Sequence, residues 1–149
     1  MTEILFYQLE TRPLESVLPD LLSRSLAKGW RAAVQFGSDE RLEQIDSHLW
    51  TYDDTSFLPH GSRAEGNAAD QPVWLTCHED NPNGADIRFF VDGATTEQFG
   101  GYERIVFLFD AADSEAVSNA RQTWKAVKAS GSDATYWRQD ESGRWAQHG

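Results

Sequence analysis

The chain has 149 residues, which is enough for one domain with one hydrophobic core and too few for two. Apolar residues make up 40% of the sequence, and 6 Trp, 4 Tyr and 8 Phe supply the large side chains that such a core needs. The formal net charge of -11 repels phosphate backbones, so non-specific binding of nucleic acid by the whole surface is excluded.

The single cysteine, Cys77, has no second thiol with which to form an internal disulfide, and this fits a reducing compartment. Only 4 His accompany it, so we expect no structural zinc site and no other metal. No stretch approaches the roughly 20 apolar residues of a membrane span, and the first residues lack the basic start of an export signal. We therefore expect a cytoplasmic protein without membrane association and without a cofactor.

Strands and helices are predicted to alternate from the start of the chain. The apolar run at residues 4–7 predicts a strand buried on both faces, and leucines at helical spacing predict a helix over residues 14–26. Pro19 removes one backbone donor inside that pattern, so the helix either kinks there or starts near that residue. A second strand at residues 32–36 makes a right-handed βαβ unit the natural assembly, so the sheet begins parallel.

The rest of the chain continues this alternation. A second helix is predicted over residues 38–50 with Ser38 as its N-cap, and the small, polar residues 61–70 predict a surface loop. The remaining predicted elements are strands at 72–76, 87–91 and 104–109, a helix at 114–130, and a closing hairpin of 136–138 with 144–146. These elements indicate an α/β fold.

The sequence contains no motif that points to a catalytic site. The turn Gly37-Ser38-Asp39-Glu40 stands where a phosphate-binding loop would be, but its two carboxylates repel phosphate. No Gly-x-Ser-x-Gly is present, and Cys77 and His78 would point to opposite faces of a strand, as a core thiol and a surface imidazole. A small doubly wound nucleotide-binding enzyme remains the alternative class, which nucleotides would reveal by raising the melting temperature.

The last predicted helix has a charge opposite to that of the whole chain. Residues 116–131 contain Arg121, Lys125 and Lys128 and no acidic residue. On a helix these three cations lie on one stripe beside Trp124, which suits a short acidic ligand with an apolar anchor. The alternative is structural: bases near a helix C-terminus complement the helix dipole, and Trp124 then belongs to the core.

A second group of apolar and aromatic residues surrounds the end of the helix predicted at 38–50. It contains Trp50, Phe57 and Pro59, within Leu49-Trp50 and Ser56-Phe57-Leu58-Pro59-His60. These residues form either a protein-docking surface or a small cluster buried under the loop. A third class, a module that binds single-stranded DNA through Trp50, Trp74 and Trp124, is disfavoured by the net charge of -11.

With these motifs the chain resembles the chi subunit of bacterial DNA polymerase III, a small accessory protein of the clamp loader. The similarity extends over nearly the whole length, through Phe6-Tyr7, Gly29-Trp30-Arg31, Leu49-Trp50 with Ser56-Phe57-Leu58-Pro59-His60, and Arg121-x-x-Trp124-Lys125. The resemblance implies a single domain over residues 1–149 with a three-layer α/β/α, Rossmann-like fold and a mainly parallel mixed sheet. It also implies two binding faces and no catalysis.

One implied face binds the acidic C-terminal tail of the single-stranded-DNA-binding protein, which ends in an aromatic residue and a free carboxylate. Arg121 matches the Arg that would hold the carboxylate, Lys125 matches a neighbouring Lys, and Trp124 stands where the family usually has Tyr. Phe109 falls where an apolar pocket residue is expected, and Lys128 extends the cationic stripe. Val117 is a departure, because another basic residue can occur there.

The other implied face docks the psi subunit or a competing helicase partner, and its matching residues are Trp50, Phe57 and Pro59. The resemblance thus implies an adaptor that supports DNA replication by linking the clamp loader to coated single-stranded DNA. Such a protein meets DNA only indirectly, which agrees with its negative charge.

Overall fold

The structure is a computed structural model that describes residues 2–51, 69, 71–96 and 98–148, with only the backbone of Trp50 and Thr51. Its strands are β1 (Glu3–Leu9), β2 (Ala32–Gln35), β3 (Val73–Thr76), β4 (Ile87–Phe90), β5 (Arg104–Asp110), β6 (Asp133–Gln139) and β7 (Trp145–Gln147). Its helices are α1 (Leu14–Ala27), α2 (Asp39–Thr51) and α3 (Ser114–Ala129). Every strand and helix predicted from the sequence is present, with ends shifted by a few residues; nearly all of the loop predicted at 61–70 lies outside the described residues.

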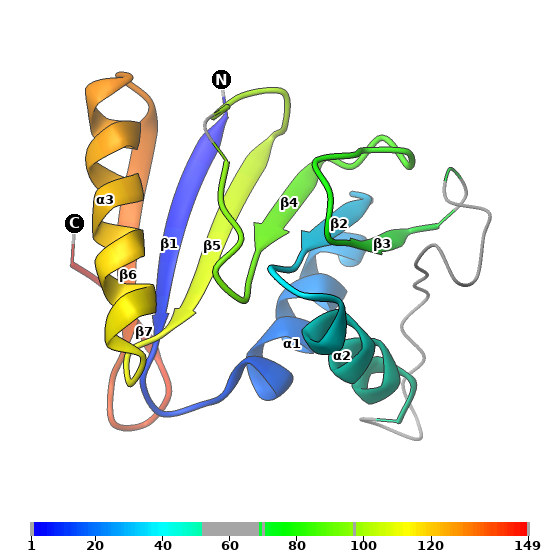
Figure 1. Cartoon of the computed structure of the whole chain (residues 1–149), viewed down its shortest axis with the longest axis horizontal. Helices are drawn as coiled ribbons and strands as arrows, with labels where there is room; N and C mark the ends of the chain where they lie inside the picture. The colour runs from blue at the N-terminus through cyan, green and yellow to red at the C-terminus, as the bar shows by residue number, and fades with distance from the viewer. Residues whose placement is uncertain (1, 52–68, 70, 97, 149) are drawn as a thin grey trace.

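All the strands belong to one sheet, in the order β3-β2-β4-β5-β1-β6-β7. Neighbouring strands from β3 to β6 pair in parallel, and β7 pairs antiparallel with β6 as the predicted closing hairpin. The predicted α/β fold with a mainly parallel mixed sheet is therefore confirmed (Figure 1).

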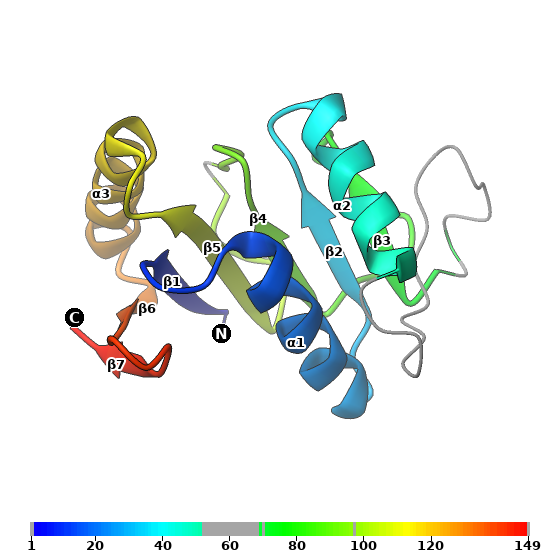
Figure 2. The same ribbon diagram turned by 90° about the horizontal axis from the view of Figure 1, so that it is seen from below.

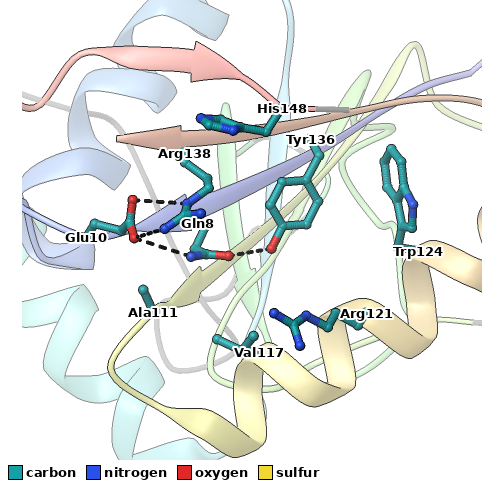
Figure 3. A pocket seen from close by; sticks show the side chains of 9 residues that line it. All are labelled: Gln8, Glu10, Ala111, Val117, Arg121, Trp124, Tyr136, Arg138 and His148. Carbon is teal, nitrogen blue, oxygen red and sulfur yellow. Dashed lines mark hydrogen bonds and ion pairs between the residues drawn. The ribbon is translucent and has the colours of Figure 1, made fainter. Parts of the chain in front are cut away.

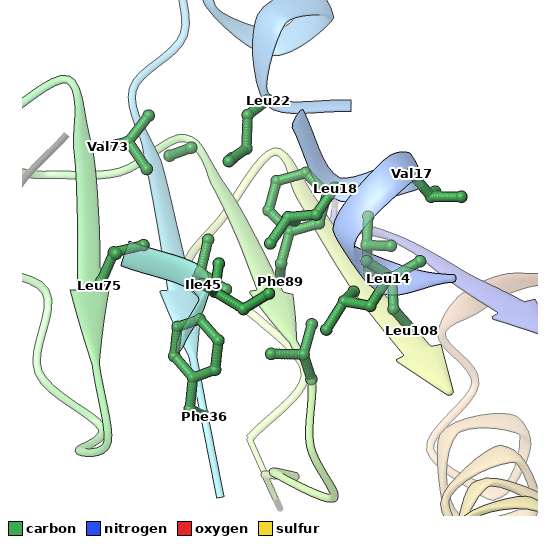
Figure 4. Packing of buried hydrophobic residues seen from close by; sticks show 14 of the residues in the cluster. Leu14, Val17, Leu18, Leu22, Phe36, Ile45, Val73, Leu75, Phe89 and Leu108 are labelled. Carbon is green, nitrogen blue, oxygen red and sulfur yellow. The ribbon is translucent and has the colours of Figure 1, made fainter. Parts of the chain in front are cut away.

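The two faces of the sheet are covered by different helices, as the alternation along β1 shows. Leu5 and Leu9 belong to the hydrophobic cluster that packs against α1 and α2, whereas Ile4 and Phe6 belong to the cluster that packs against α3. Figure 2 shows these helices along the twisted sheet, and Figure 4 shows the first cluster from close by. The arrangement is the three-layer α/β/α architecture that the resemblance implied.

Helix α1 begins at Leu14 and continues through Pro19, so a helix that starts near Pro19 is wrong. Proline has no N–H to donate to the carbonyl of Glu15, four residues earlier. The Nε2 atom of His48, on α2, lies 2.7 Å from that carbonyl oxygen, and its ring N–H donates to it. The contact from a neighbouring helix thus satisfies an acceptor that the proline leaves open.

The connections between strands position the functional site. The first unit runs from β1 through α1 to β2, but β5 and β4 lie between the two strands, so β1 and β2 are parallel without being neighbours. The unit from β5 through α3 to β6 crosses β1 on the opposite face. Crossovers therefore leave β1 and β5 toward different faces, the arrangement beside which ligands commonly bind in open α/β sheets.

Candidate functional site

A cavity of about 580 Å³ lies between α3 and β6, near the carboxyl end of β1 (Figure 3). Its lining residues come from β1 and the turn after it, from the β5–α3 connection, from α3, and from the C-terminal hairpin and tail. They are Gln8, Glu10, Ala111, Val117, Arg121, Trp124, Tyr136, Arg138 and His148. Segments that are distant in sequence thus share one cavity because β1 pairs with both β5 and β6.

Two of the residues predicted to bind a tail peptide, Arg121 and Trp124, lie in this cavity. Arg121 is exposed, points from α3 into the cavity, and has no hydrogen-bond or ion-pair partner among the described residues (Figure 3). The Trp124 ring is half-buried, with its centroid 5.3 Å from that of Phe6 and 5.7 Å from that of Tyr136, edge to face in both cases. An unpaired guanidinium therefore stands one helical turn from a fixed aromatic wall.

The other predicted tail-binding residues do not line the cavity. Lys125 is exposed on α3, and the Lys128 ammonium lies 4.8 Å from the Trp124 ring centroid and 3.3 Å from the Ala134 carbonyl oxygen. Phe109 is buried behind the cavity, where its ring makes an edge contact with Tyr136 at 5.9 Å between centroids. The cationic stripe thus continues outside the cavity, and Phe109 lies in the core cluster behind it and lines the second cavity, described below.

The sequence analysis missed a polar chain that forms the opposite wall. The Tyr136 hydroxyl donates to the Gln8 side-chain oxygen, and the Gln8 amide nitrogen lies 3.5 Å from Glu10 Oε1. Arg138 binds the same carboxylate with two donors, Nη2 at 2.6 Å from Oε1 and Nε at 3.2 Å from Oε2. Gln8 and Arg138 are paired in register across β1 and β6, a neighbourhood that no local sequence pattern predicts.

The contacts set the charges of this wall. The hydrogen bonds from Arg138 hold the pKa of Glu10 below its ordinary value, so Glu10 is ionised at neutral pH. Burial raises the pKa of Tyr136, against the opposing effect of Arg121 and Arg138, so its hydroxyl stays protonated. The cavity therefore presents two guanidinium groups and one carboxylate, and only Arg121 is without a partner in the part of the chain that the structure describes.

A second cavity, of about 680 Å³, lies at the carboxyl ends of β4 and β5 between the starts of α1 and α3. Its charged lining residues are Glu15, Asp92, Asp110, Asp113 and Glu115, with Arg41 as the basic residue. Arg41 pairs with Glu15, and Asp113 accepts from the backbone N–H groups at the start of α3. A carboxylate thus already caps the start of α3, and the excess of acidic residues in the cavity repels phosphate, which disfavours the nucleotide-binding alternative.

The start of α2, in the turn after β2, is likewise capped by a side chain of the protein. Ser38 Oγ accepts from the Arg41 N–H at 3.3 Å, which confirms Ser38 as the N-cap of α2, and donates to Asp92 Oδ2 at 2.7 Å. A Cβ added to Gly37 would lie 2.1 Å from the Asp92 carbonyl oxygen. Gly37 therefore serves the close approach of two loops.

Cys77 and His78 follow β3, which ends at Thr76, so the prediction that they point to opposite faces of a strand is wrong. Cys77 is half-buried against the core, and burial, together with a hydrogen bond to Asp39, raises the pKa of its thiol to about 11, whereas His78 is exposed. Within the described ranges, no three His, Cys, Asp or Glu side chains converge as a metal ion would require. The helices described there are also too short or too polar to cross a bilayer.

The second predicted binding face falls largely outside the described residues. Phe57 and Pro59 are not among them, and of Trp50 only the backbone is described, in the last turn of α2. Leu49, the residue before Trp50, is buried in the core cluster under α2. This face remains a prediction.

Comparison with known proteins places the chain in a family. A family model described as "DNA polymerase III chi subunit, HolC" matches residues 1–135, and thus ends before Tyr136, Arg138 and His148. A "Probable DNA polymerase III subunit chi" of Rickettsia prowazekii (strain Madrid E) is 23% identical over 101 residues. That match covers 63% of this chain and 61% of the relative, so the chain spans about three fifths of the relative's length. Because the family model matches most of its residues, the chain belongs to the DNA polymerase III chi subunit family.

Proposed function

We propose that this protein is a non-catalytic accessory subunit of the DNA polymerase III clamp loader that binds the acidic C-terminal tail of the single-stranded-DNA-binding protein. It supports DNA replication in the cytoplasm and meets DNA only through that partner. Family membership supports the role in the polymerase assembly. The observation that carries the tail assignment is the Arg121 guanidinium, which lines a cavity beside Trp124 and has no partner among the described side chains.

The chemistry of the cavity suits the end of such a tail. Arg121 offers a planar fork of donors for a carboxylate, and the exposed part of the Trp124 ring with Val117 offers apolar surface for a terminal aromatic residue. Lys125 and Lys128, which lie along the same helix outside the cavity, attract the acidic residues that precede the terminus. Because the whole chain carries a charge of -11, this local attraction is essential and weakens with added salt.

We propose the face that carries Trp50, Phe57 and Pro59 as the site for the psi subunit or another clamp-loader or helicase partner. The two faces are separate in this proposal. Phe57→Ala should therefore reduce capture of the clamp-loader partner and leave tail binding unchanged. Loss of both together would mean one merged site or a misfolded protein.

The deciding experiment is a calorimetric titration with a synthetic acidic tail peptide, made once with a free C-terminal carboxylate and once with a C-terminal amide. We expect the free acid to bind and the amide to bind at least about 10-fold more weakly, since the amide lacks the charge that Arg121 recognises. The difference between the peptides should disappear in Arg121→Ala. Equal binding of both peptides by the wild-type protein would overturn the tail assignment.

The nucleotide-binding alternative has its own measurement. Common nucleotides should leave the melting temperature unchanged, because Ser38 and Asp113 cap the starts of α2 and α3, and the charged groups that line the cavity beside the start of α1 are mainly carboxylates. A clear rise with one nucleotide would favour the alternative.

A further inference from the structure

The cavity contains two guanidinium groups that differ in what they contact. Arg121, on α3, has no partner among the described residues, whereas Arg138, on β6, is held by Glu10 through two hydrogen bonds. Both side chains line the same 580 Å³ space (Figure 3). A ligand that binds Arg121 therefore lies close to Arg138, a second cation that already pairs with the carboxylate of Glu10.

The Glu10–Arg138 pair is open to exchange. Its side chains are 43% exposed for Arg138 and 26% exposed for Glu10, so water reaches both partners. Exposed ion pairs add little to stability, because solvent screens the attraction and two long side chains must be ordered. A carboxylate from a ligand can replace Glu10 on Arg138 with little loss, because the number of charge-assisted hydrogen bonds stays the same.

The backbone of Glu10 is fixed independently of its side chain. The consecutive N–H groups of Glu10, Thr11 and Arg12 all donate to the Gln139 side-chain oxygen, at 2.9, 3.1 and 3.1 Å. Gln139 is buried at the end of β6, so this turn is tied to the strand that carries Arg138. Replacing the Glu10 carboxylate should thus leave the walls of the cavity in place.

We propose that Glu10 is an internal competitor of the ligand: it occupies Arg138 in the free protein, and a ligand with two carboxylates displaces it and engages Arg121 and Arg138 together. The inference rests on the proposed function, since it takes the ligand to be an acidic chain terminus. It adds Arg138 as a second anion-binding residue and makes the cavity selective for a terminal carboxylate with a further acid close by. Glu10 rejects ligands that bring only one carboxylate, because its own charge remains in the cavity.

The test measures affinity for two peptides with the same aromatic C-terminal residue and a free terminal carboxylate. One carries acidic residues before the terminus, and in the other these are replaced by Asn and Gln. The variants are Glu10→Gln, Arg138→Gln and the double variant, and Glu43→Gln, an exposed site on α2, is the control for the change in net charge. Melting temperatures of all variants show that folding is retained.

We expect Glu10→Gln to bind the acidic peptide about 3- to 10-fold more tightly, and Glu43→Gln to bind it like the wild type. The gain should be lost in the double variant, because without Arg138 there is no cation to release. An equal gain in the double variant would mean that Glu10 acts by simple repulsion, and an unchanged affinity in Glu10→Gln would mean that the ligand does not open the Glu10–Arg138 pair. Either result overturns the inference. The proposed function is nevertheless preserved if the wild type binds the peptide in a manner that depends on Arg121. If neither the wild type nor any variant binds either peptide, both the inference and the proposed function are overturned.

Discussion

Replacement of Arg121 by Ala tests the central assignment, because this side chain has no other role in the described structure. It is exposed on α3, lines the 580 Å³ cavity, and makes no hydrogen bond or ion pair within the described residues. Its removal therefore breaks no hydrogen bond or ion pair with the residues that the structure describes, and we expect the free energy of unfolding to change by no more than about 0.5 kcal/mol. Any loss of binding then reports on the ligand rather than on the fold.

The expected loss follows from the kind of contact. A hydrogen bond between a guanidinium and a carboxylate is worth about 1.5–3 kcal/mol, and an exposed guanidinium loses little hydration before it binds. Arg121→Ala should thus raise the dissociation constant for the tail peptide about 10- to 150-fold. The adjacent Lys125 lies outside the cavity, so Lys125→Ala should have a smaller effect that is seen mainly at low salt.

Isothermal titration calorimetry with the free-acid peptide measures this change directly. Arg24→Ala is the matched control, since Arg24 is also an exposed arginine on a helix but lies on α1, which packs on the opposite face of the sheet. Its dissociation constant should equal that of the wild type. An unchanged affinity in Arg121→Ala, or equal losses in both variants, would refute the reasoning, because the effect would then be absent or would reflect net charge alone.

Three further changes test other parts of the structure. The Glu10–Arg138 pair stabilises the folded protein above pH 4.5, the ordinary pKa of Glu10, and this contribution is lost as the pH falls through the lowered pKa. The free energy of unfolding of the wild type should therefore exceed that of Glu10→Gln by no more than about 1 kcal/mol at neutral pH, and the difference should vanish in acid. Gly37→Ala forces a methyl group to within 2.1 Å of the Asp92 carbonyl oxygen and should lower the free energy of unfolding by about 1–3 kcal/mol in urea titrations. Because the pKa of Cys77 is raised to about 11 from 9.0, its alkylation by iodoacetamide at pH 8 should be about 100-fold slower in the native than in the unfolded protein.

Each of these outcomes has a contrary result. Gly100→Ala, where an added Cβ meets nothing within 4 Å, is the control for Gly37→Ala, and equal destabilisation would show that the close approach is not the cause. If the wild type and Glu10→Gln still differ in free energy of unfolding at pH 2, the difference does not come from the ion pair. Rapid native alkylation of Cys77 would contradict its burial.

Local sequence patterns were sufficient for the secondary structure. Short apolar runs located the strands, and apolar residues at helical spacing located the helices. The Ser38 cap followed from residue type, because its hydroxyl serves the nearest free N–H groups. At Pro19 the sequence left two possibilities open, and the structure excludes a helix that starts there, because α1 begins at Leu14. The His48 ring that donates to the carbonyl left open by the proline comes from another helix. Such a contact has no local signature.

The cavity likewise combines residues that a local pattern predicts with residues that only the tertiary structure brings together. The sequence placed Arg121 and Trp124 on one side of a helix, because a period of 3.6 residues brings positions three apart together. It did not reveal that Gln8, Glu10 and Arg138 would face them, since that depends on β1 lying between β5 and β6. Helical periodicity acts over a few residues and is written in the chain, whereas strand order is decided by which crossovers bury the two apolar faces of the sheet, and only the folded molecule makes that choice.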